Sequence, residues 1–247
     1  MQNPVLILGA SGEIGKHIAK KFSQNGQSLI LHGNKNTPPK IRFISDSQTI
    51  ESICADLTDE KSVQKLFDFI SRKYSALSGV VFAVAQPFSN RLSHRTSWRV
   101  FDEQMQTQLK AAHLTLSAAY QMLKEHGKDT VARVIIISTE YSLGLPPVKI
   151  APYVAAKSAL NAYALSLAQE WLVSNIKVHI LAPGLLRSNL TSHMPELYLE
   201  ELIKNMPEKK LTSAEDVANF AAFLMTAEAD PLYGSIIPIT RGRRVTH

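Results

Sequence analysis

Short apolar runs alternate with amphipathic segments along most of the chain. Strands are predicted at residues 5–8, 28–32, 50–57, 79–85, 133–139, 177–181 and 235–240, with a further extended piece at 41–45. Helical periodicity follows the first strand as far as Gly26 and recurs at residues 61–74, 98–124, 153–171 and 214–225. The segment 98–124 is expected to be bent or divided, and to turn inward Leu109, Leu114, Leu116, Ala118 and Leu123.

This alternation of buried strands with helices predicts an α/β fold, built as a doubly wound parallel sheet with helices on both faces. Residues 79–85 are apolar at nearly every position, which suits a strand that is covered on both sides. No composition shift or internal repeat divides residues 1–247, so we expect a single domain. In such sheets ligands bind at the carboxyl ends of the strands.

A glycine-rich turn joins the first predicted strand to the first helix. Gly9, Gly12 and Gly15 are spaced three apart, and Ser11 adds a hydroxyl. Closely spaced glycines let the backbone approach a pyrophosphate, which then lies against the unpaired amides of the helix N-terminus. Tight turns need glycine for steric reasons too, so the turn alone leaves a nucleotide site and plain turn geometry both open.

The end of the second predicted strand bears on which dinucleotide such a turn would bind. Folds that prefer NAD usually place an acid there, which binds the ribose hydroxyls and repels a 2′-phosphate. This chain has Asn34 and Lys35 instead, which favours NADP(H), although Lys35 also suits an ordinary loop lysine. Asp56 and Leu57, at the exit of a later strand, are candidates to face the adenine, and a helix N-cap is the other explanation of Asp56.

Tyr153 and Lys157 open the helix predicted at 153–171 and stand four residues apart on one face. A phenol beside an ammonium is a candidate proton donor, because the positive charge favours the phenolate and lowers the pKa of the tyrosine from about 10. A packed ring and a solvated amine would explain the same spacing.

Composition and charge narrow the class of protein. The chain is 45% hydrophobic with a net charge of +6, enough apolar residues for a large core and only a moderate positive charge. We expect Arg241, Arg243 and Arg244 to form an exposed tail, or else to attract a phosphorylated cofactor or acidic carrier protein; no nucleic-acid motif accompanies them. The sequence has one cysteine, Cys54, and shows neither an apolar run of membrane length nor a signal peptide after Met1. These features favour a cytoplasmic, reducing compartment. No metal site is expected.

Several motifs in a fixed order resemble the short-chain dehydrogenase/reductase family. They are the glycine turn, Asp56-Leu57, Ser138-Thr139, Tyr153-x-x-x-Lys157 and Pro183-Gly184. The similarity covers nearly the whole chain, and residues 133–139, 166–170 and 182–184 look most like the 3-oxoacyl-carrier-protein reductase branch. The resemblance implies a Rossmann fold, an NADP(H) cofactor, and a segment at about 185–210 that closes over the substrate.

The resemblance also implies catalytic roles. Tyr153 would be the general acid, and Lys157 would bind the nicotinamide ribose and lower the pKa of that tyrosine. The family's serine hydroxyl, which holds the substrate oxygen, falls on Thr139 when counted along the strand and on Glu140 when counted back from Tyr153. We prefer Thr139, because the strand is the rigid reference and threonine keeps the hydroxyl, with Ser138 as a fallback. An acid at Glu140 would resemble the pteridine reductase-like branch.

The supporting residues of the family carry over with departures. Glu13 replaces a common glycine, Ala83-Val84-Ala85 replaces an Asn-Ala-Gly segment, Gln108 replaces an asparagine that supports a water relay, and Gln169 replaces a basic carrier-docking residue. The implied cofactor contacts are Gly9, Ser11, Gly12, Ile14, Gly15, Asn34, Lys35, Asp56, Leu57, Ala83, Val84, Tyr153, Lys157, Pro183, Gly184 and Leu186.

These features imply an NADPH-dependent ketone reductase, with a 3-oxoacyl thioester linked to acyl carrier protein or coenzyme A as the first-choice substrate. A pteridine- or sugar-type reductase is the alternative within the class, and the departures leave open a non-catalytic NADP(H)-binding subunit or sensor. An apolar cover for an acyl or aromatic substrate, or else helix-core packing, would explain Met194, Leu197, Tyr198, Leu199 and Leu202.

The two longest predicted helices carry more small residues than one buried face needs. They are Ala111, Ala112, Ala118, Ala119, Ala159, Ala162 and Ala164. Together with the family resemblance, they lead us to expect a homotetramer through these helices, or pairing with a homologous subunit.

Overall fold

Parallel strands form one central sheet in the computed structural model, which describes residues 2–42, 44–88, 90–188, 190–192 and 194–243, without the side chain of Tyr198. In this part of the chain the sheet has 7 strands, in the order β3-β2-β1-β4-β5-β6-β7. The strands are β1 (Val5–Leu8), β2 (Leu29–Gly33), β3 (Ile50–Cys54), β4 (Gly79–Phe82), β5 (Ala132–Ile137), β6 (Ile176–Pro183) and β7 (Ile236–Ile239). The winding direction reverses between β1 and β4, which opens a crevice for a ligand at their carboxyl ends.

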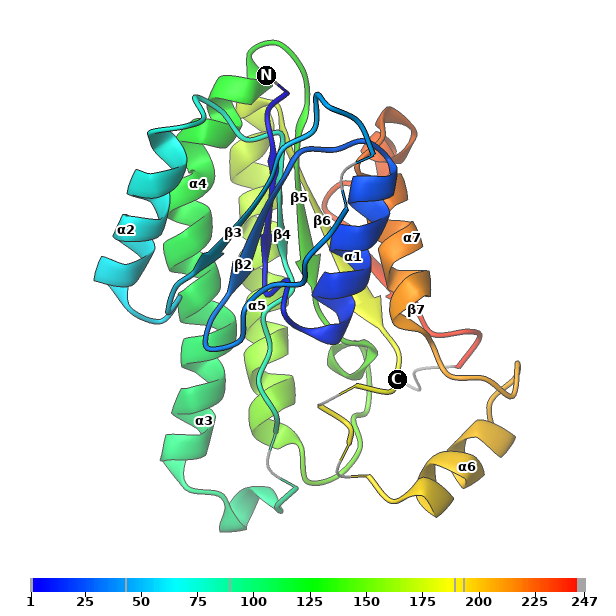
Figure 1. Cartoon of the computed structure of the whole chain (residues 1–247). Coiled ribbons are helices and arrows are strands. Elements are labelled where there is room, and N and C mark those ends of the chain that lie inside the picture. Colours follow the sequence, from blue (N-terminus) through cyan, green and yellow to red (C-terminus); the bar gives the residue numbers. More distant parts are fainter. Residues whose placement is uncertain (1, 43, 89, 189, 193, 244–247) are drawn as a thin grey trace.

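Helices cover both faces of this sheet, which confirms the predicted doubly wound arrangement. They are α1 (Glu13–Gln24), α2 (Glu60–Ser71), α3 (Trp98–Met105), α4 (Ala111–Gly127), α5 (Ala151–Trp171), α6 (Glu196–Lys204) and α7 (Ala214–Leu224). Figure 1 shows α1 and α7 on one side of the sheet and α2 and α4 on the other. Helix α5 lies with α2 and α4, because its Leu160 and Leu167 join the same hydrophobic cluster.

Alternate strand residues pack against these two helical layers. In β1, Leu6 and Leu8 belong to the core under α2, α4 and α5, whereas Val5 and Ile7 belong to the core under α1 and α7. A strand that is covered on both faces can be apolar throughout, so polar chemistry is left to the residues that follow each strand.

The long helix predicted at 98–124 is divided, as expected. A π-helical turn, η2 (Gln106–Lys110), separates α3 from α4. Such turns insert an extra residue and are frequent at functional sites. The leucines predicted to face inward do so fully at Leu116 and Leu123 and partly at Leu109 and Leu114. The prediction for Ala118 is wrong, since it is exposed and the next residue, Ala119, is buried instead.

The extended piece predicted at 41–45 is not a strand in its described residues. The Ile44 N–H donates to the Gln48 side chain at 2.9 Å, so this segment closes on itself as a loop. The Gln48 amide in turn donates to the backbone oxygens of Ser23 and Gln27, at 3.1 and 2.7 Å. The loop is therefore fastened to the end of α1, and β3 keeps the edge of the sheet.

The predicted exposed tail is wrong for both described arginines. Arg241 donates from Nε to Asp216 at 3.0 Å and from Nη1 to Glu208 at 2.7 Å. Arg243 donates to the buried carboxylate of Glu140 at 2.7 Å. The segment after β7 is thus fastened to the body of the protein, while Arg244 lies outside the described residues.

The segment predicted to cover a substrate contains α6 and a small core of its own. Leu185, Leu199, Met206 and Leu211 form a separate buried cluster, with Met194 and Leu202 packed against it. Leu197 is exposed, and the Tyr198 side chain lies outside the described part of the chain. Helix-core packing therefore accounts for Met194, Leu199 and Leu202 but not for Leu197. The part of this segment that lines the pocket is Leu185, Leu186, Ser188, Leu190 and Thr191.

The small residues on α4 and α5 mostly serve the core of this chain. Ala111, Ala112, Ala119 and Ala164 are buried within it, and only Ala118 and Ala162 are exposed. Oligomerisation through these helices stays a prediction, with less support from small residues than the sequence pattern suggested. No helix in the described residues combines the length and the apolar character needed to cross a membrane.

Candidate active site

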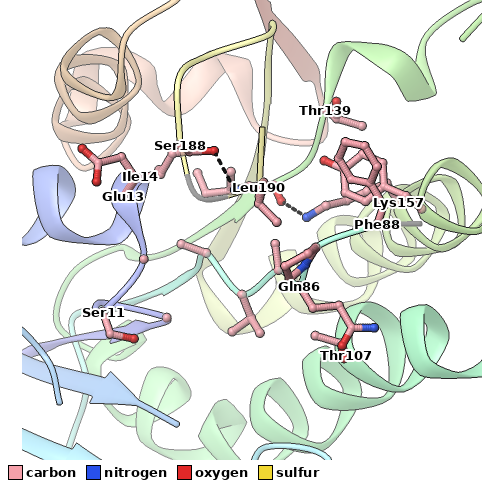
Figure 2. Close-up of a pocket in the computed structure, with 18 of the residues that line it drawn as sticks. Ser11, Glu13, Ile14, Gln86, Phe88, Thr107, Thr139, Lys157, Ser188 and Leu190 are labelled. Carbon is pink, nitrogen blue, oxygen red and sulfur yellow. Dashed lines mark hydrogen bonds between the residues drawn. The ribbon is translucent and has the colours of Figure 1, made fainter. Parts of the chain in front are cut away.

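A pocket of about 500 Å³ lies along the carboxyl ends of the strands. Its walls come from the residues that follow successive strands, including Gly9, Asn34, Asp56, Ala83, Thr139 and Gly184. Figure 2 shows Ser11, Glu13 and Ile14 on one side of this space and Thr139, Lys157 and Phe88 on the other. The pocket therefore joins the glycine turn to the Tyr153 and Lys157 pair, as a long ligand requires.

The glycine turn is shaped for close backbone approach. Gly9 has φ +86°, and a Cβ added there would lie 2.7 Å from the Ala83 carbonyl oxygen. Gly12 is the N-cap of α1 and supplies no side-chain cap, which leaves the first amides of the helix to a ligand. Gly15 does not line the pocket; a Cβ there would meet the Gly9 oxygen at 2.2 Å, so this glycine supports the turn from behind.

His32 holds the turn in place, a role that its position in an apolar strand did not reveal. The Gly9 N–H donates to His32 Nδ1 at 3.3 Å, and His32 Nε2 lies 2.9 Å from the Ala55 carbonyl oxygen. Nδ1 is therefore the acceptor and Nε2 carries the hydrogen. Burial lowers the pKa of His32, which keeps the ring in this neutral form.

Asp56 and Lys35 lie near each other at one end of the pocket. The backbone N–H and the hydroxyl of Thr58 donate to Asp56, at 2.9 and 2.7 Å. These hydrogen bonds lower the pKa of Asp56, and the charges of Lys35 and Lys110 lower it further. The N-cap of α2 is Asp59, whose carboxylate accepts from Ser62 N at 2.8 Å, so the N-cap explanation of Asp56 is wrong.

Glu13 departs from the usual glycine without closing the turn. Its carboxylate lies 3.6 Å from His17 Nδ1, one helical turn along α1, and 40% of the side chain is exposed. Glu13 therefore borders the pocket, while its carboxylate also lies near His17 along the surface of α1.

Tyr153 stands at the far end of the pocket, where only 7% of the residue is exposed. The ring of Phe88 packs against it, with centroids 5.0 Å apart. Burial raises the pKa of Tyr153 to about 12, against a smaller opposing effect of the hydrogen bond with the Thr139 side chain. In the protein alone the pKa of Tyr153 is thus raised, not lowered as predicted, because desolvation is the largest influence on it.

Lys157 is 2% exposed and donates from Nζ to the Ile137 carbonyl oxygen at 2.7 Å (Figure 2). Burial lowers the pKa of this amine to about 7. The alternative explanation of the Tyr153 and Lys157 spacing, in which the lysine amine is solvated, is therefore wrong. Lys157 is a desolvated group whose protonation responds to any negative charge placed in the pocket.

The structure separates the three candidates for the hydroxyl position. Thr139 lines the pocket and bonds to Tyr153. Ser138 also lines the pocket, but its hydroxyl donates to Asn161 Oδ1 at 2.5 Å. Glu140 does not line the pocket, and its carboxylate accepts from Arg243. This geometry favours Thr139.

A closed hydrogen-bond network secures the turn that carries Thr139. The Asn161 amide donates to Ser142 Oγ at 2.9 Å, and Ser142 Oγ donates to the Thr139 carbonyl oxygen at 2.7 Å. Asn161 stands one helical turn after Lys157, so the network also ties the end of β5 to α5.

Gln108 is fully buried in the π-helical turn and does not line the pocket. Neither polar atom of its amide has a hydrogen-bond partner among the described residues. Buried amides are normally paired, so this amide, in a turn that packs against α5, keeps a hydrogen-bonding capacity that the described residues do not use.

The pocket brings most of the predicted site residues together. They are Gly9, Ser11, Gly12, Ile14, Asn34, Lys35, Asp56, Leu57, Ala83, Val84, Thr139, Tyr153, Lys157, Pro183, Gly184 and Leu186. Lining residues that the sequence did not indicate include Gln86, Phe88, Thr107, Tyr141, Ser188 and Leu190. Most of these lie in the loops after β4, β5 and β6, where position relative to the strand ends is the only local signal.

A nicotinamide dinucleotide fits the donor set of this pocket. The uncapped α1 N-terminus and the bare Gly9–Gly12 backbone suit a pyrophosphate, and Lys157 can donate to ribose hydroxyls. The replacement of a side-chain amide by Ala83 removes one donor, and the amide of Gln86 stands nearby in the same loop.

Fold and pocket together define an oxidoreductase that uses a nicotinamide cofactor, and the chain belongs to the short-chain dehydrogenase/reductase family. The matching family model is described as enoyl-(acyl carrier protein) reductase and covers residues 9–243.

Several relatives extend this similarity over the whole chain. The 3-oxoacyl-[acyl-carrier-protein] reductase FabG of Rickettsia conorii is 29% identical over 96% of this chain and 95% of its own. A 3alpha-hydroxysteroid dehydrogenase of Mediterraneibacter gnavus is 25% identical over 99% of this chain and 98% of its own. A solved Pseudomonas aeruginosa RhlG/NADP active-site complex has the same fold, with a TM-score of 0.86 at 20% identity over 98% of this chain and 96% of that one.

Proposed function

We propose that this protein is an NADPH-dependent ketone reductase, with a 3-oxoacyl thioester linked to acyl carrier protein or coenzyme A as the preferred substrate. The observation that carries the proposal is the meeting of Thr139, Tyr153 and Lys157 in the pocket that also contains the glycine turn. The similarity to 3-oxoacyl-[acyl-carrier-protein] reductases supports the substrate class. The single cysteine, exposed Cys54, supports a reducing compartment such as the cytoplasm.

Tyr153 is the proton donor of the proposed reaction. The bound nicotinamide supplies the hydride that reduces the carbonyl carbon. Burial keeps the Tyr153 phenol protonated at neutral pH, so its O–H is available to the carbonyl oxygen as negative charge develops there. The Thr139 hydroxyl, already bonded to that phenol, donates to the same oxygen and fixes its direction.

Lys157 stabilises the phenolate that remains after proton transfer. Its pKa of about 7 lies far below that of an ordinary lysine because the amine is desolvated. Negative charge on Tyr153, or on phosphate groups in the pocket, favours the ammonium and draws a proton onto Nζ. The buried amide of Gln108, in the turn that packs on α5, is proposed to hold a water that relays this proton.

Preference for NADPH over NADH rests on the end of β2. Asn34, Lys35 and Asn36 line the pocket where NAD-preferring folds carry an acid. An ammonium at Lys35 attracts a 2′-phosphate, whereas a carboxylate would repel it.

A Tyr153→Phe variant tests the proposal. Loss of the proton donor should lower kcat by about 10²-fold or more while NADPH still binds, followed through nicotinamide fluorescence. Tyr163→Phe is the matched control, because Tyr163 lies on the same helix and pairs with His113 outside the pocket, at 3.1 Å. Undiminished turnover in Tyr153→Phe would refute the assignment.

A second candidate is a non-catalytic NADP(H)-binding subunit or sensor. The departures from the family pattern at Glu13, Ala83, Ala85 and Gln108 favour it, because each changes a residue that supports the cofactor or the proton donor in the family. Binding of NADPH without consumption across a panel of 3-oxoacyl thioesters, pteridines, sugars and steroid ketones would select this candidate. Consumption of NADPH with any panel member would select the reductase and name its substrate class: acyl, pteridine, sugar or steroid.

A further inference from the structure

A buried carboxylate stands immediately beside the proposed substrate-binding hydroxyl. Glu140 follows Thr139 in the short turn η3 (Glu140–Ser142) and is 1% exposed. Neither the proton-transfer set nor the pocket lining uses this acid. A charged group so close to the reacting centre needs a partner, because an unpaired buried charge is strongly destabilising.

Arg243, which lies 103 positions further along the chain, is that partner. Its Nη1 donates to Glu140 Oε1 at 2.7 Å, and it also lies 3.4 Å from the Tyr141 hydroxyl. The guanidinium carbon is 5.4 Å from the centre of the Tyr141 ring, within the range of a cation–π contact. One arginine from the segment after β7 therefore contacts two successive residues of the η3 turn.

The other neighbours of Glu140 come from the exit of β6. The Leu185 backbone N–H lowers the pKa of its carboxyl, and a Cβ on Gly184 would lie 3.4 Å from Oε2. Among the described residues Oε2 itself has no hydrogen-bond partner. Among the described residues, Arg243 is the charged group that faces the acid, and Tyr141 is its titratable neighbour. Burial raises the pKa of the Glu140 carboxyl, and the Arg243 charge opposes this shift.

The turn contacted by Arg243 sets the position of the proposed site. Thr139 Oγ1 accepts from the Tyr141 backbone N–H at 3.4 Å, so a shift of Tyr141 moves the hydroxyl that bonds to Tyr153. Tyr141 also lines the pocket, and ionisation of its phenol would raise the pKa of Tyr153. Gly184 and Leu185, the other neighbours of Glu140, line the same pocket.

The segment that bears Arg243 is itself anchored. The neighbouring Arg241 pairs with Asp216, which belongs to the capping box of α7, and with Glu208. Arg243 also borders a second, smaller cavity beside α6 that Leu202 and Met206 line. It thus stands between the substrate-covering segment and the η3 turn.

We propose that Arg243 is a positioning residue for the reductase site, which neutralises Glu140 and clamps Tyr141 so that the Thr139 hydroxyl stays aimed at Tyr153. This inference rests on the proposed function for its catalytic readout. It makes the chain segment after β7 part of the active site, although no atom of Arg243 lines the main pocket.

The first test compares Arg243→Gln with the double variant Glu140→Gln/Arg243→Gln. The single variant leaves a buried acid without its counter-ion. We expect its kcat to fall about tenfold or more at pH 8 and to recover toward pH 6, as Glu140 takes up a proton. The double variant should stay within about threefold of wild type across this range, because two neutral amides can bond to each other. The Kd for NADPH should change less than twofold in both.

Arg99→Gln is the matched control, because it breaks an exposed ion pair with Glu103 on α3 (3.7 Å). A merely structural role of Arg243 predicts equal losses at every pH and no rescue by the second substitution, and that result would overturn the proposal. So would a kcat of Arg243→Gln within twofold of wild type throughout.

A substrate-free measurement separates this inference from the proposed function. The melting temperature of Arg243→Gln should rise as pH falls from 8 to 6 relative to the double variant, whatever reaction the protein catalyses. If wild type reduces no carbonyl compound, the proposed function fails. The melting curves then still test whether Arg243 neutralises Glu140. Should Arg243→Gln not fold at pH 8, folding of the double variant under the same conditions supports the pairing, and failure of both overturns it.

Discussion

Removal of the Asn161 side chain should loosen the turn that carries Thr139. The amide of Asn161 accepts from Ser138 Oγ at 2.5 Å and donates to Ser142 Oγ at 2.9 Å, and it is 5% exposed. In Asn161→Ala both bonds are lost together, and the Ser138 hydroxyl keeps only a long 3.4 Å contact with Ser142 Oγ.

The expected size of this effect follows from the two lost bonds. Each contributes about 1 kcal/mol net, and leaving a buried hydroxyl poorly paired costs about 1 kcal/mol more, so the loss is about 2–3 kcal/mol. For a chain of 247 residues, each kcal/mol corresponds to about 2–4 °C in melting temperature, which predicts a drop of about 4–12 °C. Because Ser142 also holds the Thr139 carbonyl oxygen, kcat should fall together with stability.

Urea unfolding of Asn161→Ala measures this loss against a matched control. Ser166→Ala lies on the same helix, and its exposed hydroxyl bonds only to the Ala162 carbonyl oxygen at 3.1 Å, so it should cost less than about 0.5 kcal/mol. Ser138→Ala should be non-additive with Asn161→Ala, since they share one network. If Asn161→Ala costs no more than the Ser166 control, the network does not hold the turn.

Further predictions concern the pocket and its glycine turn. The folded-state pKa of Lys157 is about 7, below the ordinary 10.5, so the stability that Lys157 contributes is complete above pH 10.5 and is lost as the pH falls toward 7. The unfolding free energy of wild type minus that of Lys157→Met should therefore rise between pH 7 and 10. A flat difference would contradict the lowered pKa. In a fluorescence titration, Lys35→Glu should weaken the binding of NADPH about tenfold or more (about 1.4 kcal/mol) without weakening the binding of NADH. Equal losses for both cofactors would remove Lys35 from the phosphate site, and so would the same loss in the control variant Lys124→Glu on α4. Gly9→Ala should abolish cofactor binding and lower the free energy of unfolding in urea by about 1–3 kcal/mol. This loss should exceed that of Gly26→Ala, because Gly26 also has a positive φ (+79°) but a Cβ there would meet nothing within 4 Å. Equal losses would show that the clash of the new Cβ with the Ala83 carbonyl oxygen is relieved.

The fold and most of the pocket could be predicted because their signals are local. Apolar runs followed by glycine or polar residues mark the strand ends, and parallel strands bring those ends to one edge of the sheet. For the same reason the strand leading to Thr139 indicated a residue that lines the pocket, whereas the count back from Tyr153 led to Glu140, which does not. A count through a loop depends on its length, whereas a strand has a constant rise per residue.

The supporting residues could not be predicted, since their partners are distant in sequence. Asn161 lies in an apolar-periodic helix, and its partner Ser138 is 23 positions away; Arg243 and Glu140 are 103 positions apart. No local pattern links such pairs. The raised pKa of Tyr153 could not be predicted either, because spacing on a helix does not reveal how deeply the phenol is buried.

Transfer of deuterium from NADPH labelled at both C4 positions tests the central claim most directly. With a 3-oxoacyl thioester as substrate, mass spectrometry should find one deuterium on the carbinol carbon of the product for wild type. Tyr153→Phe should bind the labelled cofactor with unchanged affinity and transfer almost none. A product without deuterium, or equal labelling by Tyr153→Phe, would contradict a hydride transfer completed by the Tyr153 proton.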